Sequence, residues 1–318
     1  MCRAFDLFSG AGGSSWGARM AGATILGALD MDPTAVATFR DNFPEAAAHV
    51  YESPAEKIDP QEIADELGEI DLLLASPECT NHSCAKGNGQ RSEDSRMTAF
   101  QVTRFADALK PRWIIVENVL QMASWPKYPT FLNALRRRGF KLREYKLNAA
   151  DFSVPQSRRR LFIVCDRDTR PAEEIHRVSN SRLGAGSFVN LDGAFAFSSL
   201  RSPRRALATL ERAKRARQQL GDRSPFLLVY YGSDAAGGWQ RLNVPLRTVT
   251  TLDRFAVVKW EDNQEVMRML QVPELKVAMG FEESFKLNFG TRRDKVRLLG
   301  NAVCPPLMKA LVHGLLTR

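Results

Sequence analysis

Apolar runs that alternate with helix-like segments are the feature of this 318-residue chain that most restricts its fold. Over the first 165 residues these runs have the length of buried strands, and the intervening segments show helical spacing of apolar residues. Strands that alternate with helices predict a doubly wound, mostly parallel α/β sheet, which binds ligands at the carboxyl ends of its strands. The expected strands are residues 4–8, 24–29, 71–75, 113–117 and 161–165, and the expected helices are residues 33–42, 60–67, 99–109 and 128–138.

This alternation stops after residue 167, where Arg, Ser and Gly become frequent. We interpret residues 1–167 as one large domain and residues 168–262 as a second, smaller one. The second domain contains a basic amphipathic helix over residues 203–220 and strand-like runs at 226–231 and 247–258. The arginines of that helix are candidates for phosphate contacts, and a solvated helix face is the alternative.

Residues 263–318 are expected to return to the large domain. Helical spacing predicts helices at residues 265–280 and 302–316. No helix precedes the first expected strand, so we expect the last helix to cover it.

Charge and composition narrow the class of protein. The net charge of +9 favours a polyanionic partner. No apolar stretch of about eighteen residues occurs, and the first residues lack the layout of a signal peptide, which predicts a cytoplasmic protein without a membrane span. The five scattered cysteines form no C-x-x-C pair, so neither a disulfide framework nor a metal site is expected.

A glycine-rich loop follows the first expected strand, in F-D-L-F-S-G-A-G-G. Gly10, Gly12 and Gly13 allow a sharp turn and a close approach of the backbone to a ligand, although a tight turn without a ligand would also use them. The second strand ends in L-D-M-D, where Asp30 is placed to bind the ribose hydroxyls of a nucleoside. Asp32, which precedes Pro33, is better explained as a helix N-cap.

Three further segments carry reactive groups to strand ends. Cys79 follows a buried strand in a polar turn, as a nucleophile would, whereas a lone cysteine is more often an inert core residue. Glu117 and Asn118 end the strand I-I-V-E-N-V, where partial burial would raise the pKa of the acid; a solvated carboxylate is the alternative. Arg158 and Arg160, in Q-S-R-R-R, share one face of a strand, although this segment alone is better explained as a solvated basic turn.

Taken together, these segments resemble the DNA (cytosine-5) methyltransferase family along nearly the whole chain and in the family's motif order. The resemblance is carried by F-D-L-F-S-G-A-G-G, A-S-P-E-C-T-N-H-S, E-N-V, Q-S-R-R-R, P-L-R-T-V-T-T, A-M-G-F and G-N-A-V-C-P-P. It implies the fold of S-adenosylmethionine-dependent methyltransferases with a target-recognition domain. The implied substrate is double-stranded DNA, from which the target cytosine flips out of the helix.

The resemblance also implies roles for individual residues. Cys79 would add to carbon 6 of cytosine while Glu117 protonates ring nitrogen 3. Arg160 would hold the carbonyl oxygen of the base, Arg158 would support the site, and Asn118 would orient the nucleophile's loop. The residues implied to bind S-adenosylmethionine are Phe8, Ser9, Gly10, Gly12, Gly13, Asp30, Met31, Glu52, Pro77, Asn301 and Ala302.

The sequence departs from the family pattern near the nucleophile. Glu78 stands where the family usually has Pro, Thr80 where Gln is usual, and His82 where Phe is usual. Met31 replaces an aromatic residue that commonly follows the ribose acid.

Three other functions compete with this interpretation. An amino-group methyltransferase would need an aromatic residue where this chain has Cys79. A tRNA cytosine-5 methyltransferase would share the fold, but the C-F-T tripeptide of that branch is absent. A non-catalytic DNA-binding relative would be expected to lack Cys79 or Glu117. We therefore predict an enzyme that acts as a monomer on DNA, with a restriction enzyme or phage-defence proteins as its expected partners.

Overall fold

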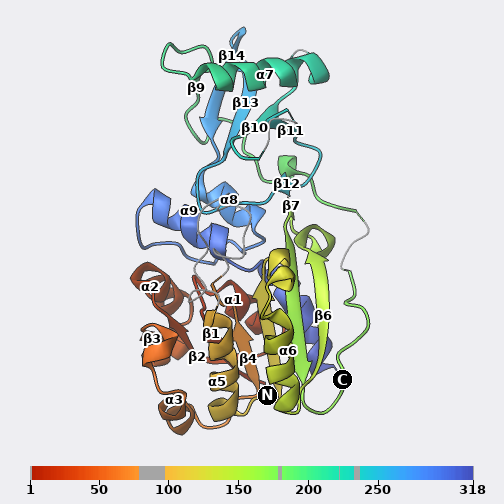
Figure 1. Ribbon diagram of the computed structural model, residues 1–318. Coiled ribbons are helices and arrows are strands. Elements are labelled where there is room, and N and C mark those ends of the chain that lie inside the picture. The colour runs from red at the N-terminus through yellow and green to blue at the C-terminus, as the bar shows by residue number, and fades with distance from the viewer. Residues whose placement is uncertain (1, 79–96, 178–180, 222, 233–236, 318) are drawn as a thin grey trace.

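The computed structural model describes the chain except for residues 1, 79–96, 178–180, 222, 233–236 and 318. A seven-stranded sheet with the order β3-β2-β1-β4-β5-β8-β6 forms the centre of the large domain (Figure 1). Its strands are β1 (Arg3–Leu7), β2 (Thr24–Asp30), β3 (Val50–Glu52), β4 (Leu72–Ala75), β5 (Trp113–Asn118), β6 (Lys141–Asn148) and β8 (Arg159–Asp166). Strands β1 to β5 pair in parallel, and β8 runs antiparallel to both β5 and β6. The predicted doubly wound, mostly parallel sheet is therefore confirmed.

Helices cover both faces of this sheet. One face is covered by α1 (Gly13–Met20), α2 (Pro33–Asn42) and α10 (Pro305–Leu316), and the other by α3 (Pro60–Leu67), α5 (Gln101–Leu109) and α6 (Tyr128–Arg137). Successive side chains of a strand point to opposite faces, so Leu72 and Leu74 join the first core and Leu73 and Ala75 the second. The side chain of Ala4 on β1 lies in the same hydrophobic core as α10. This agrees with the prediction that the last helix covers the first strand.

Two glycines bring α1 close to the start of α10. Gly13 and Gly17 are four residues apart and so lie on one face of α1. A side chain at Gly13 would overlap the carbonyl oxygen of Val303, and one at Gly17 would overlap that of Pro305 and lie 2.7 Å from the Met308 Cβ. The contact between these helices thus depends on the absence of two side chains.

The small domain is built on an antiparallel five-stranded sheet with the order β11-β10-β13-β14-β9. Its strands are β9 (Ser198–Ser199), β10 (Phe226–Val229), β11 (Trp239–Arg241), β13 (Phe255–Glu261) and β14 (Gln264–Met269), and α7 (Leu207–Leu220) packs on it. Figure 1 shows α7 at the end of the small domain farthest from the main sheet. Between the domains, β7 (Gln156–Ser157) and β12 (Leu246–Arg247) pair in parallel.

Several expected boundaries in the second half of the chain were wrong. The helix expected over residues 265–280 is a strand, β14, followed by the short helix α8 (Val272–Ala278). Helix α8 can begin only after Gln271, whose side chain forms a capping box with Glu274. The run at 247–258 divides into β12 and β13, and α7 starts at residue 207 instead of 203. Helix α9 (Arg292–Asn301) was not predicted, because charged residues interrupt its apolar spacing.

Both chain ends lie at the end of the large domain opposite the small domain (Figure 1). None of the helices that the structure describes is long and apolar enough to span a membrane.

Candidate active site

The carboxyl edge of the main sheet gathers the segments that the sequence singled out. In the parallel register, Leu7 is level with Leu29 and Ala75, and Asp30 is level with Glu52. The glycine loop, the L-D-M-D turn, the start of the cysteine segment and the E-N-V segment all leave the sheet at this edge. Parallel pairing thus brings into one region residues that are far apart in the sequence.

The glycine loop has a constrained backbone. Phe8 has a φ of 60°, which is rare for a residue with a side chain, and Gly10 and Gly12 have φ of 53° and 92°. The N–H groups of Phe8 and Ser9 both donate to the carbonyl of Leu29, at 2.8 and 3.2 Å. The end of β2 therefore holds the loop in an unusual conformation, of the kind found at functional sites.

Asp30 links the glycine loop to the turn after β2. Its carboxylate accepts hydrogen bonds from the N–H of Gly10 at 2.7 Å and from the N–H of Asp32 at 2.9 Å. Burial raises the pKa of Asp30, and these two N–H groups oppose that shift. Asp32 caps α2 through the N–H groups of Thr34 and Ala35, so the N-cap interpretation is confirmed.

The residues expected to bind a nucleoside-containing cofactor fit such a group. A carboxylate has about four acceptor positions, so Asp30 retains capacity for hydroxyl groups beyond these bonds. The side-chain position of Gly10 faces open space, and Met31 presents an apolar side chain that is 71% exposed. Glu52 is exposed at the end of β3 beside Asp30. Of the residues expected from the last motif, Asn301 is exposed and Ala302 is buried.

Glu117 and Arg160 form an ion pair at the same edge. The Arg160 Nε lies 3.1 Å from the Glu117 Oε1, and Glu117 is buried. Because β8 runs antiparallel to β5, the start of β8 lies beside the end of β5, which brings the two residues together. Burial raises the pKa of Glu117, and the charges of Arg160 and Arg158 oppose this shift. Glu117 is therefore not a solvated carboxylate, and Arg160 does not belong to a solvated basic turn.

Asn118 holds the segment that leads to the proposed nucleophile. Its Nδ2 donates to the carbonyl of Pro77 at 3.0 Å, and its Oδ1 accepts from the N–H of Val119 at 2.9 Å. Pro77 is buried, two positions before Cys79. Cys79 itself, together with Thr80 and His82, lies outside the described residues.

Arg158 serves as a buried link between segments. Its guanidinium donates to the carbonyls of Val249, Gly300 and Ala302 at 2.8 to 3.0 Å. The neighbouring Gln156 binds the N–H of Val249 and the carbonyl of Ala278. The Q-S-R-R-R segment therefore fastens two other segments to the main sheet: the chain just after β12 and the last motif. Of the three arginines in this segment, only Arg160 forms an ion pair with Glu117 in the described structure.

Sequence reasoning missed Asp6. This residue of β1 is fully buried, and its Oδ2 accepts a hydrogen bond from the Ser15 hydroxyl at 2.7 Å. Its Oδ1 has no hydrogen-bond partner among the described residues. An acid inside the apolar run F-D-L-F was the signal that could have identified it.

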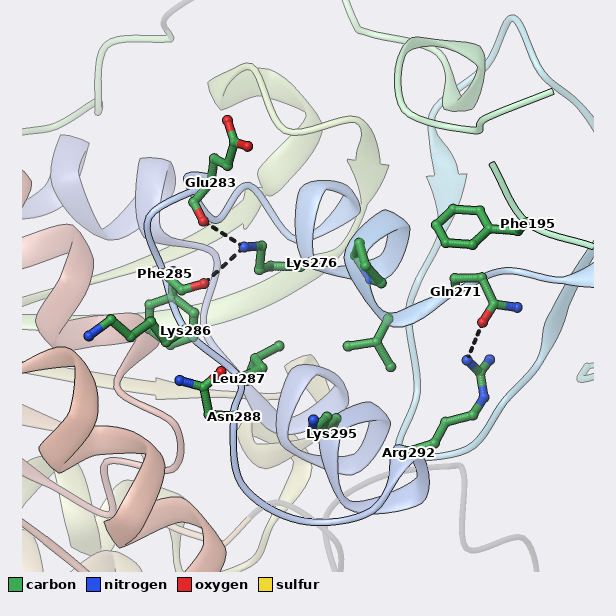
Figure 2. A pocket seen from close by; sticks show the side chains of 12 residues that line it. Phe195, Gln271, Lys276, Glu283, Phe285, Lys286, Leu287, Asn288, Arg292 and Lys295 are labelled. Atoms are coloured by element: carbon green, nitrogen blue, oxygen red, sulfur yellow. Dashed lines mark hydrogen bonds between the residues drawn. The ribbon is translucent and has the colours of Figure 1, made fainter. Parts of the chain in front are cut away.

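A cavity among the described residues lies away from this edge of the sheet. It has a volume of about 660 Å³ and is bordered by α8, α9 and the chain between them (Figure 2). None of its lining residues is a predicted site residue. Figure 2 shows Lys276 beside Glu283 and Phe285, and its Nζ donates to their backbone carbonyls at 2.8 Å. We therefore locate the active site by the residues at the sheet edge and not by this cavity.

Comparison with known proteins identifies the family to which this arrangement corresponds. The family model for C-5 cytosine-specific DNA methylases matches residues 2–316. Type II methyltransferase M1.HphI of Haemophilus parahaemolyticus is 25% identical over 326 residues, which cover 98% of this chain and 86% of the relative. Type II methyltransferase M.AgeI of Thalassovita gelatinovora is 31% identical over 170 residues. That match covers 51% of this chain and only 38% of M.AgeI.

A solved structure gives the same fold independently. The methyltransferase EhMeth of Entamoeba histolytica superposes with a TM-score of 0.72 at 16% identity, covering 100% of this chain and 98% of that one. At this level of identity the likeness supports the fold alone.

Proposed function

Because the chain belongs to the C-5 cytosine-specific DNA methylase family, we propose that it methylates carbon 5 of cytosine in double-stranded DNA. S-adenosylmethionine, bound beside the glycine loop and Asp30, would supply an electrophilic methyl group. The observation that carries the proposal is the buried pair of Glu117 and Arg160 at the edge where Asn118 holds the segment that leads to Cys79.

The protein's own groups would make the base reactive. The thiolate of Cys79 forms a bond to carbon 6 while Glu117 donates a proton to ring nitrogen 3. Arg160 donates a charged hydrogen bond to the carbonyl oxygen and stabilises the charge that develops there. Carbon 5 becomes nucleophilic and takes the methyl group. A base then removes the proton from carbon 5, the bond to sulfur breaks, and nitrogen 3 returns its proton to Glu117.

The raised pKa of Glu117 supports its role as the acid. Burial raises the pKa of Glu117, which is the direction of shift that favours a proton donor. Arg160 limits the shift, so that the carboxylate that remains after donation is stabilised.

The target base must leave the duplex before Cys79 can reach carbon 6. We propose that the small domain recognises the target sequence and that the protein acts in the cytoplasm as a monomer on DNA. A restriction enzyme or phage-defence proteins are the proposed partners.

Covalent trapping tests the nucleophile. Bisulfite sequencing of DNA from cells that express the protein would first identify the target site. A duplex with 5-fluorocytosine at that site should then form a covalent complex with wild type and with Cys84→Ala, but not with Cys79→Ala. Trapping retained in Cys79→Ala and lost in Cys84→Ala would reverse the assignment. Methylation of an RNA of the same sequence, with none of the duplex, would overturn the proposed substrate.

A further inference from the structure

The chain passes between the two domains several times, because the segment around β12 also returns toward the main sheet. Two of the other passages meet at one buried ion pair. Asn190 lies on the crossing into the small domain, whereas Arg268 lies near the end of β14, where the chain begins to leave the small domain. Glu274 belongs to α8, which follows the second crossing. Arg268 and Glu274 are 5% and 4% exposed.

The hydrogen bonds of this pair fasten all three segments together. The Arg268 guanidinium donates to both Glu274 carboxylate oxygens at 2.7 Å and to the Asn190 carbonyl at 2.5 Å. Glu274 also accepts from the N–H of Asn190 at 2.9 Å and from the N–H of Gln271 at 2.7 Å. Two-point pairing of this kind defines direction as well as distance.

Neighbouring groups hold the junction from two sides. The rings of Phe195 and Phe197, on the crossing into the small domain, lie 5.0 and 4.9 Å from the Arg268 guanidinium. On the other crossing, Arg292 of α9 donates to the Gln271 side chain at 2.9 Å and to the Leu270 carbonyl at 2.6 Å (Figure 2). The pair therefore lies where a change in geometry would be passed to the whole small domain.

Stability alone does not require charge at such a site. Replacing both members of a buried ion pair with apolar residues of similar size is often neutral or stabilising, whereas removing one member leaves a buried charge without its partner. An apolar pair cannot form the directional hydrogen bonds that join Arg268 and Glu274 to Asn190 and Gln271.

We propose that the Arg268–Glu274 pair sets the orientation of the small domain over the main sheet, so that a base presented by the small domain reaches Glu117 and Arg160. The two residues are positioning residues and take no part in the chemistry. This inference rests on the proposed function only for its catalytic consequence, because the orientation itself can be measured without activity.

A double replacement separates orientation from stability. In Arg268→Met/Glu274→Leu we expect a melting temperature within a few degrees of wild type and an unchanged Kd for S-adenosylhomocysteine, because the glycine loop lies in the large domain. Small-angle X-ray scattering should show a broader distribution of interatomic distances, and single-turnover methylation should slow by about tenfold or more. Wild-type scattering together with a wild-type rate would overturn the proposal.

The ion pair of Arg217 and Glu265 provides a matched control. It is also largely buried but joins α7 to β14 within the small domain. Arg217→Met/Glu265→Leu should leave the scattering profile and the methylation rate within about threefold of wild type. An equal loss in this control would assign the effect to general damage to the small domain and contradict the proposal.

Two further results complete the test. If the double replacement does not fold, Arg268→Lys, which keeps the charge but loses the two-point pairing with Glu274, takes its place in the same comparison. If wild type methylates no DNA, the proposed function fails, and the scattering comparison still decides whether the pair sets the orientation.

Discussion

Asp6 is a carboxylate whose ionisation opposes folding. Loss of hydration on burial raises its pKa from 3.8 to about 7; the hydrogen bonds from Ser15 partly offset this shift, and the charge of Asp30 adds to it. In the unfolded chain the group regains an ordinary pKa near 4. Between these values the folded protein binds a proton that the unfolded chain does not. The stability that this proton provides is present in full below about pH 4 and is lost as the pH rises through 7.

Asp6→Asn should therefore stabilise the protein at pH 8.5 relative to wild type. The expected gain in the free energy of unfolding is on the order of 1–3 kcal/mol, because the amide has no charge to bury. The gain should shrink towards pH 5, where wild-type Asp6 is protonated in the folded state. Urea unfolding at the two pH values measures the difference. A difference that is independent of pH would show that Asp6 does not titrate in this way.

At the scale of elements, the sequence predicted best where local pattern and tertiary packing agree. The helices of residues 33–42 and 60–67 have the bounds expected, because Asp32 and Asp59 cap them and a proline follows each cap. Strand β14 was mistaken for helix because its apolar residues also suit helical spacing, and only pairing with β13 makes it a strand. Strand β6 was missed because it lies at the sheet edge, where charged residues interrupt the alternation.

The close packing of α1 against α10 can be tested by adding a side chain at Gly17. Gly17→Ala adds a methyl group that must overlap the Pro305 carbonyl, so we expect a loss of about 1–3 kcal/mol in the free energy of unfolding. This loss should appear even though alanine favours the helix by about 1 kcal/mol. Gly314→Ala in α10 has open space around it and is the control, with an expected gain of up to about 1 kcal/mol. Equal effects of the two changes on urea unfolding would contradict the packing argument.

Helix α7 gives a second test, concerning DNA. The sequence allowed either phosphate contacts or a solvated face, and the structure favours the second. Arg215 donates to the Gly237 carbonyl, Arg217 pairs with Glu265, and the helix lies far from the main sheet (Figure 1).

Neutralising Lys214 of α7 together with Arg204, which precedes the helix, should therefore leave the salt dependence of DNA binding unchanged. Arg159→Gln, at the exposed start of β8 beside the active site, is the matched control and should reduce the slope by about one unit. Fluorescence anisotropy at several salt concentrations measures both. A reduced slope for the α7 variant would restore the phosphate-contact hypothesis.

At the scale of the whole molecule, local sequence patterns indicated individual residues at the sheet edge but not the contacts between them. Glu117 and Arg160 could be chosen from their motifs, but their pairing depends on the antiparallel direction of β8, which no local pattern indicates. Arg158 was expected to support the site, and its three carbonyl partners come from segments more than 90 residues away. The Arg268–Glu274 pair was missed for the same reason, since a junction between domains exists only once both are folded.

The positions of the two chain ends bear on how the enzyme could be directed to chosen genes. Both lie at the end of the large domain opposite the small domain, and so away from the carboxyl edge of the sheet (Figure 1). A programmable DNA-binding module fused there would approach the duplex from behind the enzyme, and its linker would have to pass around the large domain to reach the same stretch of DNA. Linker length would then set how far from the module's own binding site methylation begins, which makes spacing an adjustable feature of such a fusion.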